Sequence, residues 1–263
     1  MIGIFDSGIG GLTVVKALQK KLFHQQLLYF GDTARTPYGS KSPETLVQYA
    51  RQNTEWLLEH GAKIIVVACN SASAAATVQL RKDYPGVPIF GVITPAVEAA
   101  VTKTRNGLIG LVGTRATVSS NLYGTYAKKM SDGKVQVFAN ACPLLVPLVE
   151  EGWFSAGETK RIVKKYVHPL RAKNVDTLIL GCTHYPLLKQ IFQQKMGNQT
   201  ILIDSAEELA KSVVHYLDEN PDSIKKLPKK KSVFYVSDIT SHFQYIAERW
   251  LGETIELHKV ACA

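Results

Sequence analysis

The stretch KIIVVACNSA, residues 63–72, passes without a break from apolar, β-branched residues into a cysteine and small polar side chains. The stretch DTLILGCTHYP, residues 176–186, repeats this pattern, again with a cysteine where the apolar run ends. Strands that are apolar throughout are typical of parallel sheets covered by helices on both faces. These two stretches therefore predict buried parallel strands with polar residues at their carboxyl ends.

Similar short apolar segments alternate with helix-length amphipathic segments along the whole chain. Strands are predicted at residues 2–5, 26–30, 63–68, 87–91, 108–113, 135–139, 175–180, 200–203, 232–236 and 254–257. Helices are predicted at residues 43–59, 116–129, 156–173 and 205–218. This alternation predicts the α/β class, built from doubly wound parallel sheets.

A weak internal repeat favours two similar lobes. The segment IGIFDSG, residues 2–8, resembles IGLVGTR, residues 109–115, just as the stretch around Cys69 resembles the one around Cys182. The two pairs have nearly equal separations along the chain. Buried strands look alike by chance, but two pairs in the same order, each ending in polar residues, favour a duplication. We therefore expect two lobes with a cleft between them and one cysteine on each side.

Composition excludes several classes of protein. The chain has 263 residues, of which 46% are hydrophobic and 20% charged, as in folded globular proteins of one large or two smaller domains. No apolar run reaches the ~18–20 residues of a membrane-spanning helix, and no basic segment of signal-peptide type precedes the first apolar stretch. The four cysteines lack the paired spacing of zinc sites. We therefore expect a cytoplasmic protein with reduced thiols, no bound metal and no membrane contact.

The net charge of +9 raises the question of an anionic partner. Much of the excess lies in KKLPKKK, residues 225–231, where the proline and the lack of periodicity predict a solvated loop. A nucleic-acid patch is the alternative interpretation, and we regard it as the less favoured one.

Four polar clusters follow predicted strands, directly or within a few residues: DSGIGG (6–11), TARTPYG (33–39), CNSA (69–72) and GCTHYP (181–186). In open α/β sheets, ligands bind beyond the carboxyl ends of the strands. The glycine-rich cluster lets backbone approach a ligand, and the helix after it offers amides to an anion. It does not fit the dinucleotide-binding pattern, because Thr13 stands where the third glycine is needed. The clusters predict a cleft for a small molecule.

The cysteines divide into two kinds. An isolated cysteine is usually a small core residue, and Cys142 and Cys262 fit that interpretation. Cys69 and Cys182 each end an apolar strand and precede small hydroxyl or amide side chains. If the lobes face each other, their two sulfurs meet across one cleft. Paired groups on opposite sides of a ligand suit the removal of a proton from one face and its return to the other.

The chain resembles the glutamate racemases of the aspartate/glutamate racemase superfamily over essentially its whole length. The matching motifs are residues 6–11, 31–39, 69–72, 146–150 and 181–186. The family pattern differs at Ser71, where many members have threonine and the hydroxyl is retained. The resemblance implies interconversion of L- and D-glutamate without a cofactor, which supplies D-glutamate for peptidoglycan.

Residue roles follow from the resemblance, position by position. The catalytic set that it implies is Cys69, Cys182, Asp6, Glu150 and His184, with Cys69 acting on D-glutamate and Cys182 on L-glutamate. The substrate-binding set that it implies is Asp6, Ser7, Tyr38, Gly39, Asn70, Ser71, Thr114, Thr117, Thr183 and His184. The resemblance also implies a first lobe of residues 1–95 plus 206–263 and a second lobe of residues 96–205. A homodimer is possible, but the resemblance does not decide the oligomeric state.

Simpler interpretations remain for some of these residues. Asp6 is also suited to cap a helix N-terminus, and His184 to support a helix start. Only the family register selects Glu150 over Glu151. Alternative functions are a racemase of aspartate or another small amino acid, a basic protein that binds DNA or a DNA-processing enzyme, and a yellow pyridoxal-phosphate enzyme.

Overall fold

The computed structural model describes residues 1–23, 25–225, 228 and 230–260. In that part of the chain every predicted strand is present, with its ends shifted by three residues at most. The strands are β1 Ile2–Asp6, β2 Leu27–Gly31, β3 Ile64–Val67, β4 Ile89–Gly91, β5 Leu108–Gly113, β6 Gln136–Ala141, β7 Thr177–Gly181, β8 Ile201–Asp204, β9 Val233–Val236 and β10 Leu257–Lys259.

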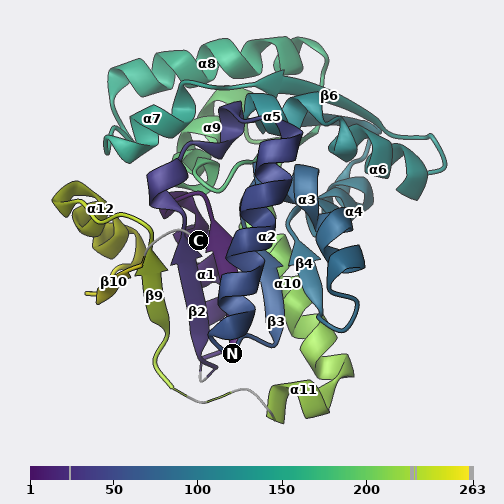
Figure 1. Cartoon of the computed structure of the whole chain (residues 1–263). Coiled ribbons are helices and arrows are strands. Elements are labelled where there is room, and N and C mark those ends of the chain that lie inside the picture. The colour runs from purple at the N-terminus through teal and green to yellow at the C-terminus, as the bar shows by residue number, and fades with distance from the viewer. Residues whose placement is uncertain (24, 226–227, 229, 261–263) are drawn as a thin grey trace.

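The strands form two sheets in which every pairing is parallel (Figure 1). The first sheet has the order β10-β9-β2-β1-β3-β4, and the second has the order β6-β5-β7-β8. Both sheets therefore share one core arrangement, in which the first strand lies between the second and the third. The predicted α/β class with two similar lobes is confirmed, and the repeated segments correspond to β1 with β5 and to β3 with β7.

The sheets also show how the chain divides between the lobes. Strands of the first sheet lie within residues 2–91 and 233–259, and those of the second lie within residues 108–204. The chain thus leaves the first lobe, builds the second and returns. The expected boundaries at residues 95/96 and 205/206 stay a prediction.

Helices cover both faces of the sheets, as Figure 1 shows. They are α1 Leu12–Gln19, α2 Pro43–Glu59, α3 Asn70–Asp83, α4 Ile93–Lys103, α5 Arg115–Ser119, α6 Leu122–Met130, α7 Leu145–Glu150, α8 Gly157–Ala172, α9 Lys189–Met196, α10 Ser205–Glu219, α11 Pro221–Lys225 and α12 Ser241–Leu251. Local sequence explains the limits of α2, where Ser42 accepts a hydrogen bond from the Thr45 amide and Pro43 occupies the first turn. Among the described residues, no helix has the length and apolar character needed to span a membrane.

The single helix predicted over residues 116–129 is wrong. The chain forms α5 and α6 instead, separated by Asn121 with a φ of 53°. A left-handed residue cannot continue a right-handed helix, and asparagine is one of the few residues that adopts this conformation at low cost. The break allows α5 to stay short, directly after β5, and Thr114 caps its start by accepting a hydrogen bond from the Thr117 amide.

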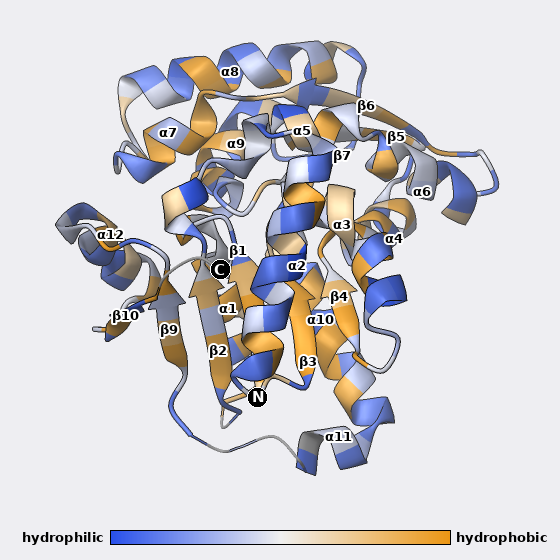
Figure 2. Cartoon of the chain, viewed as in Figure 1, coloured by the Kyte–Doolittle hydropathy of each residue, from blue (hydrophilic) through white to orange (hydrophobic). Residues whose placement is uncertain are grey.

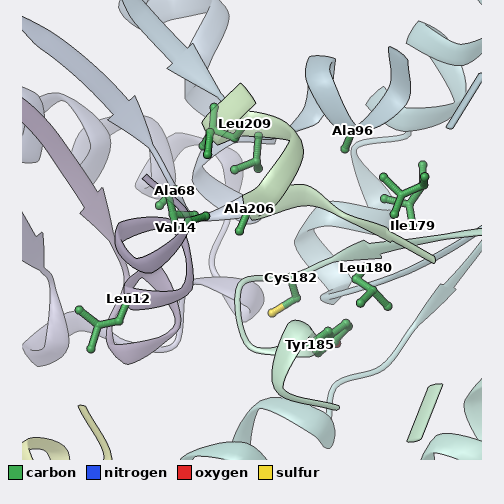
Figure 3. Packing of buried hydrophobic residues seen from close by; sticks show 14 of the residues in the cluster. Leu12, Val14, Ala68, Ala96, Ile179, Leu180, Cys182, Tyr185, Ala206 and Leu209 are labelled. Carbon is green, nitrogen blue, oxygen red and sulfur yellow. The ribbon is translucent and has the colours of Figure 1, made fainter. Parts of the chain in front are cut away.

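Side chains on the two faces of the first sheet enter different cores. Phe5, Ile65 and Val67 pack on the face covered by α2 and α3. The opposite face contributes to a larger core that also takes in residues of the second sheet, such as Leu111 and Leu180. Figure 2 shows central strands such as β1 and β3 as nearly continuous apolar segments, and Figure 3 shows residues of both lobes meeting in this core. The shared core packs the two lobes against each other.

Candidate active site

The carboxyl ends of four strands meet at one cavity. In each sheet the chain changes winding direction between the first and third strands, where ligands bind in doubly wound folds. These strands lead into Asp6, Cys69, Thr114 and Cys182. The cavity has a volume of about 300 Å³ and is lined by Ser7, Thr36, Pro37, Tyr38, Gly39, Ser40, Cys69, Asn70, Ser71, Thr114, Arg115, Pro143, Val146, Pro147, Glu150, Cys182, Thr183 and His184.

Cys69 stands where β3 turns into α3 and is 6% exposed. Its sulfur lies 4.0 Å from the hydroxyl of Ser7. Burial raises the pKa of this thiol to about 12, and the negative charge of Asp6 adds to the increase. The amides of Ala72 and Ser71, in the first turn of α3, oppose it by hydrogen bonding to the thiolate.

Asp6 is fully buried behind the cavity wall. One carboxylate oxygen accepts hydrogen bonds from the amides of Gly8 at 3.2 Å and Gly11 at 2.8 Å. The other lies 3.4 Å from the Thr183 hydroxyl of the second lobe. Burial raises the pKa of Asp6, while the charge of His184 and these amides oppose the increase. The amides of the turn that the sequence predicts to face a ligand are thus bound to Asp6. Asp6 is not itself an N-cap residue, because Gly8 and Gly11 occupy those positions.

Cys182 follows β7 and is 5% exposed. Its sulfur lies 3.7 Å from Nδ1 of His184, and Nε2 of that ring lies 3.1 Å from the Glu150 carboxylate. Burial alone lowers the pKa of His184, but the bonds to Cys182 and Glu150 outweigh it and raise the pKa to about 10. Both contacts therefore favour the protonated form of the imidazole, which lies between sulfur and carboxylate.

Hydroxyl and amide groups line the wall between the two cysteines. The hydroxyls of Ser71 and Thr114 lie 2.8 Å apart, which joins the lobes directly. Thr117 lies behind them, fully buried and 3.0 Å from the Thr114 hydroxyl, so it is not in the cavity lining. Asn70 accepts a hydrogen bond from Tyr123, while its buried Nδ2 has no partner in the described part of the chain. Buried polar groups are normally hydrogen-bonded, so this N–H₂ group is available to donate to an acceptor on a ligand in the cavity.

The segment around Tyr38 closes the cavity from the first lobe. Its ring is buried, with the hydroxyl bonded to Asp32 and 3.1 Å from Nδ2 of Asn53. Gly39 approaches the second lobe so closely that a Cβ would lie 2.7 Å from that of Thr114. Only glycine fits there, so this position sets the spacing of the two lobes.

Cavity-lining residues that the sequence reasoning missed include Ser40, Arg115 and Pro143. Arg115 is exposed at the rim and follows Thr114 directly. Its place directly after a strand end was a weak signal, because an exposed cation there faces solvent as readily as a cavity. Cys142 is buried, as predicted for a core residue, and Cys262 lies outside the described residues. Among the residues with a described position, no group of three His, Cys, Asp or Glu side chains could hold a metal ion.

Comparison with known proteins identifies the class of this chain. The chain is similar to the glutamate racemase of Syntrophus aciditrophicus, with 44% identity over 97% of this chain and 93% of the relative. It is similar to that of Chlorobaculum tepidum, with 44% identity over 95% and 92%. The chain is an isomerase, an amino-acid racemase.

The solved structures and the family agree with this class. A glutamate racemase isoform of Bacillus anthracis has a TM-score of 0.92 and 36% identity, covering 99% of this chain and 97% of its own. The Francisella tularensis enzyme, solved with D-glutamate, has a TM-score of 0.92, 35% identity and the same coverage. The Asp/Glu/Hydantoin racemase model matches residues 12–213. The chain belongs to the Asp/Glu/Hydantoin racemase family, and the resemblance to glutamate racemases drawn from its motifs is confirmed.

Proposed function

We propose that this protein interconverts L- and D-glutamate and that Cys69 and Cys182 act as its two acid/base groups. The observation that supports this most is that both thiols line one cavity, each from a different lobe and each beside its own ionisable group. A single base would explain neither the second buried cysteine nor the second ionisable group. Each thiol serves one face of the substrate α-carbon.

Reaction from L-glutamate begins at Cys182. Its thiolate, paired with the His184 imidazolium, takes the α-proton, and the Cys69 thiol delivers a proton to the other face. The high pKa of Cys69 keeps that sulfur protonated and ready to donate. The Glu150 carboxylate holds the imidazole in place and stabilises its positive charge.

Reaction from D-glutamate reverses these assignments. Cys69 must then lose its proton, although burial and the charge of Asp6 both disfavour the thiolate. Substrate supplies the compensation, because its ammonium group brings a positive charge into the cavity. The amides of Ser71 and Ala72 stabilise the thiolate further.

The carbanionic intermediate needs fixed hydrogen-bond donors, since no electron-sink cofactor is expected. The unpartnered Nδ2 of Asn70 supplies such a donor from the first lobe, while the hydroxyls of Ser71 and Thr114, which bond each other, line the same cavity. Donors already fixed by the fold stabilise developing charge without reorganising during the reaction. Thr183 and the segment of Tyr38 and Gly39 complete the substrate-binding wall.

Glutamate is the substrate that the comparisons favour over aspartate. The Francisella tularensis structure was solved with D-glutamate and that of Escherichia coli with L-glutamate. The aspartate racemase of Picrophilus torridus is only 20% identical, with a TM-score of 0.54, and so supports a common fold alone. By the same reasoning we propose that the D-glutamate produced enters peptidoglycan synthesis.

Circular dichroism of the amino acids tests the proposed reaction. Purified protein incubated with L-glutamate should bring the signal to zero, as should protein incubated with D-glutamate, without added cofactor. L-Aspartate should keep its signal under the same conditions. Unchanged glutamate signals would exclude the reaction, and faster loss of the aspartate signal would reassign the substrate.

A further inference from the structure

The helix α12 follows a strand of the first sheet but reaches the acid/base pair of the second lobe. His242, in its first turn, places Nε2 at 2.7 Å from the backbone carbonyl oxygen of Glu150. Glu150 is the last residue of α7, and carbonyls at a helix end have no partner within their own helix. The His242 ring therefore caps α7 from another element and fixes the residue that holds His184.

The opposite end of α12 contacts His184 itself. The rings of Trp250 and His184 meet edge to face, with centroids 5.9 Å apart and planes at 87°. This is a favourable geometry for aromatic pairs. Hydrogen bonds to Cys182 and Glu150 hold the imidazole within its plane, and the indole restricts its movement out of that plane.

Strong contacts fasten α12 to the first lobe. The Lys16 ammonium on α1 donates a hydrogen bond of 2.7 Å to the carbonyl of Trp250. Ile246 is buried on the inner face of α12, whereas Tyr245 is 59% exposed on the outer face. A cavity of about 240 Å³ lies between α7 and α12, lined by Glu150, His242 and Ile246 among others. The two ends of α12 thus bridge this space rather than fill it.

We propose that α12 is a strap that positions the Glu150–His184 pair, with His242 and Trp250 as positioning residues for the chemistry at Cys182. This inference rests on the proposed function. Neither residue touches the substrate cavity, so both act through Glu150 and His184. Cys69, with its own surroundings in the first lobe, is outside the influence of the strap.

Hydrogen isotope effects separate positioning from general damage. Enantiomers are equal in free energy, so any variant must lower kcat/KM equally in both directions. His242→Leu should lower it about fivefold, the size of one net hydrogen bond. Because the Cys182 step becomes slower, the isotope effect with α-deuterated L-glutamate should rise, and that with α-deuterated D-glutamate should fall. Isotope effects that stay unchanged, or that move in the same direction, would overturn the proposal.

Matched variants support this test. His242→Gln keeps an N–H donor and should restore most of the activity, while Tyr245→Ala on the outer face should behave like the wild type. Trp250→Phe keeps an aromatic ring and should be mild, whereas Trp250→Leu should lower kcat/KM about tenfold or more by misplacing His184. His242 is exposed, so its variants keep the test open if Trp250→Leu fails to fold.

Thiol alkylation provides a measurement that does not depend on glutamate. Peptide mass spectrometry after iodoacetamide treatment should show slower alkylation of Cys182 in His242→Leu, with that of Cys69 unchanged. A selective slowing in a protein that fails to racemise glutamate would support the strap and reject the proposed function. Racemisation with wild-type alkylation and isotope effects in His242→Leu would reject the strap alone.

Discussion

The surroundings of Cys69 and Cys182 differ although the two residues occupy equivalent places in similar sheets. Cys182 has an imidazole at 3.7 Å that is itself bonded to a carboxylate. Among the residues that the structure describes, no imidazole is bonded to Cys69; its neighbours are the buried charge of Asp6, the Ser7 hydroxyl and the amides of α3. One thiol is thus paired with a cation, and the other is kept protonated by burial.

This difference suits a reaction that needs one thiolate and one thiol at the same time. Two identical sites would compete for the same protonation state, since like charges in one cavity oppose each other. The fold supplies two equivalent strand ends, and the residues after them make the ends chemically unequal. Asp6 connects the two sides, because it lies beside Cys69 and bonds Thr183 next to Cys182.

The largest expected effect comes from removing either thiol. Cys69→Ser and Cys182→Ser should each lower kcat about 10³-fold or more, because a serine hydroxyl is a poor base at neutral pH. Cys142→Ser is the matched control, a buried thiol outside the cavity, and should mainly lower stability. Cys262→Ser is a second control. Near-normal turnover in either of the first two variants would contradict the two-thiol assignment.

The isotope pattern in deuterated water should separate the two sulfurs. If they serve opposite faces, early product carries α-deuterium while recovered substrate carries almost none. The measurement is mass spectrometry of each enantiomer at low conversion, started separately from L- and D-glutamate. Equal labelling of substrate and product would mean that one base reaches both faces.

Neutralising Asp6 should bring Cys69 closer to Cys182 in reactivity. After burial, the charge of Asp6 is the main cause of the high pKa of Cys69. Asp6→Asn removes that charge and should lower the pKa by about one unit, raising the alkylation rate at pH 9 about tenfold. Buried Cys142 in the same sample is the internal control. An unchanged rate at Cys69 would assign its high pKa to burial alone.

The His184 cation should add a pH dependence to the stability of the wild type that a His184→Asn variant lacks. Its pKa is about 10 in the folded protein and ~6.5 in the unfolded chain, so its contribution is complete below pH ~6.5 and lost as pH rises through 10. Urea unfolding at pH 7 and pH 10 measures it. Between pH 7 and pH 10 the free energy of unfolding should fall by at least ~1.4 kcal/mol more in the wild type than in His184→Asn. This is the energy that corresponds to a shift of one pKa unit. Equal losses would show that the ring is neutral.

The smallest expected effect is that of chelators and carbonyl reagents. Activity should be unchanged after dialysis against EDTA and after hydroxylamine treatment, because thiols and their neighbours are proposed to do all the proton transfer. If activity is lost and added metal restores it, a metal-activated base must act in place of Cys69 or Cys182.

Much of the fold was readable from the sequence because buried parallel strands leave a strong local signal. The segments before Cys69 and Cys182 are apolar throughout, which is typical of strands buried on both faces of a parallel sheet. The break at Asn121 was missed because the sequence shows only one asparagine inside an otherwise helical pattern. Its positive φ becomes visible only in the structure. The rim residue Arg115 was missed because nothing local distinguishes a cation facing a cavity from one facing solvent.

The sequence by itself determined which residues end the strands, since the pattern of apolar residues and the polar residues that follow them are local properties. It also named Cys69, Cys182 and their helpers through family motifs. Only the tertiary structure decided what surrounds each sulfur. Thr117 lies behind Thr114, Asp6 reaches Thr183 across the cleft, and α12 returns to contact Glu150 and His184. Burial and electrostatic interactions depend on distances between residues far apart in the chain, and those distances are set by packing.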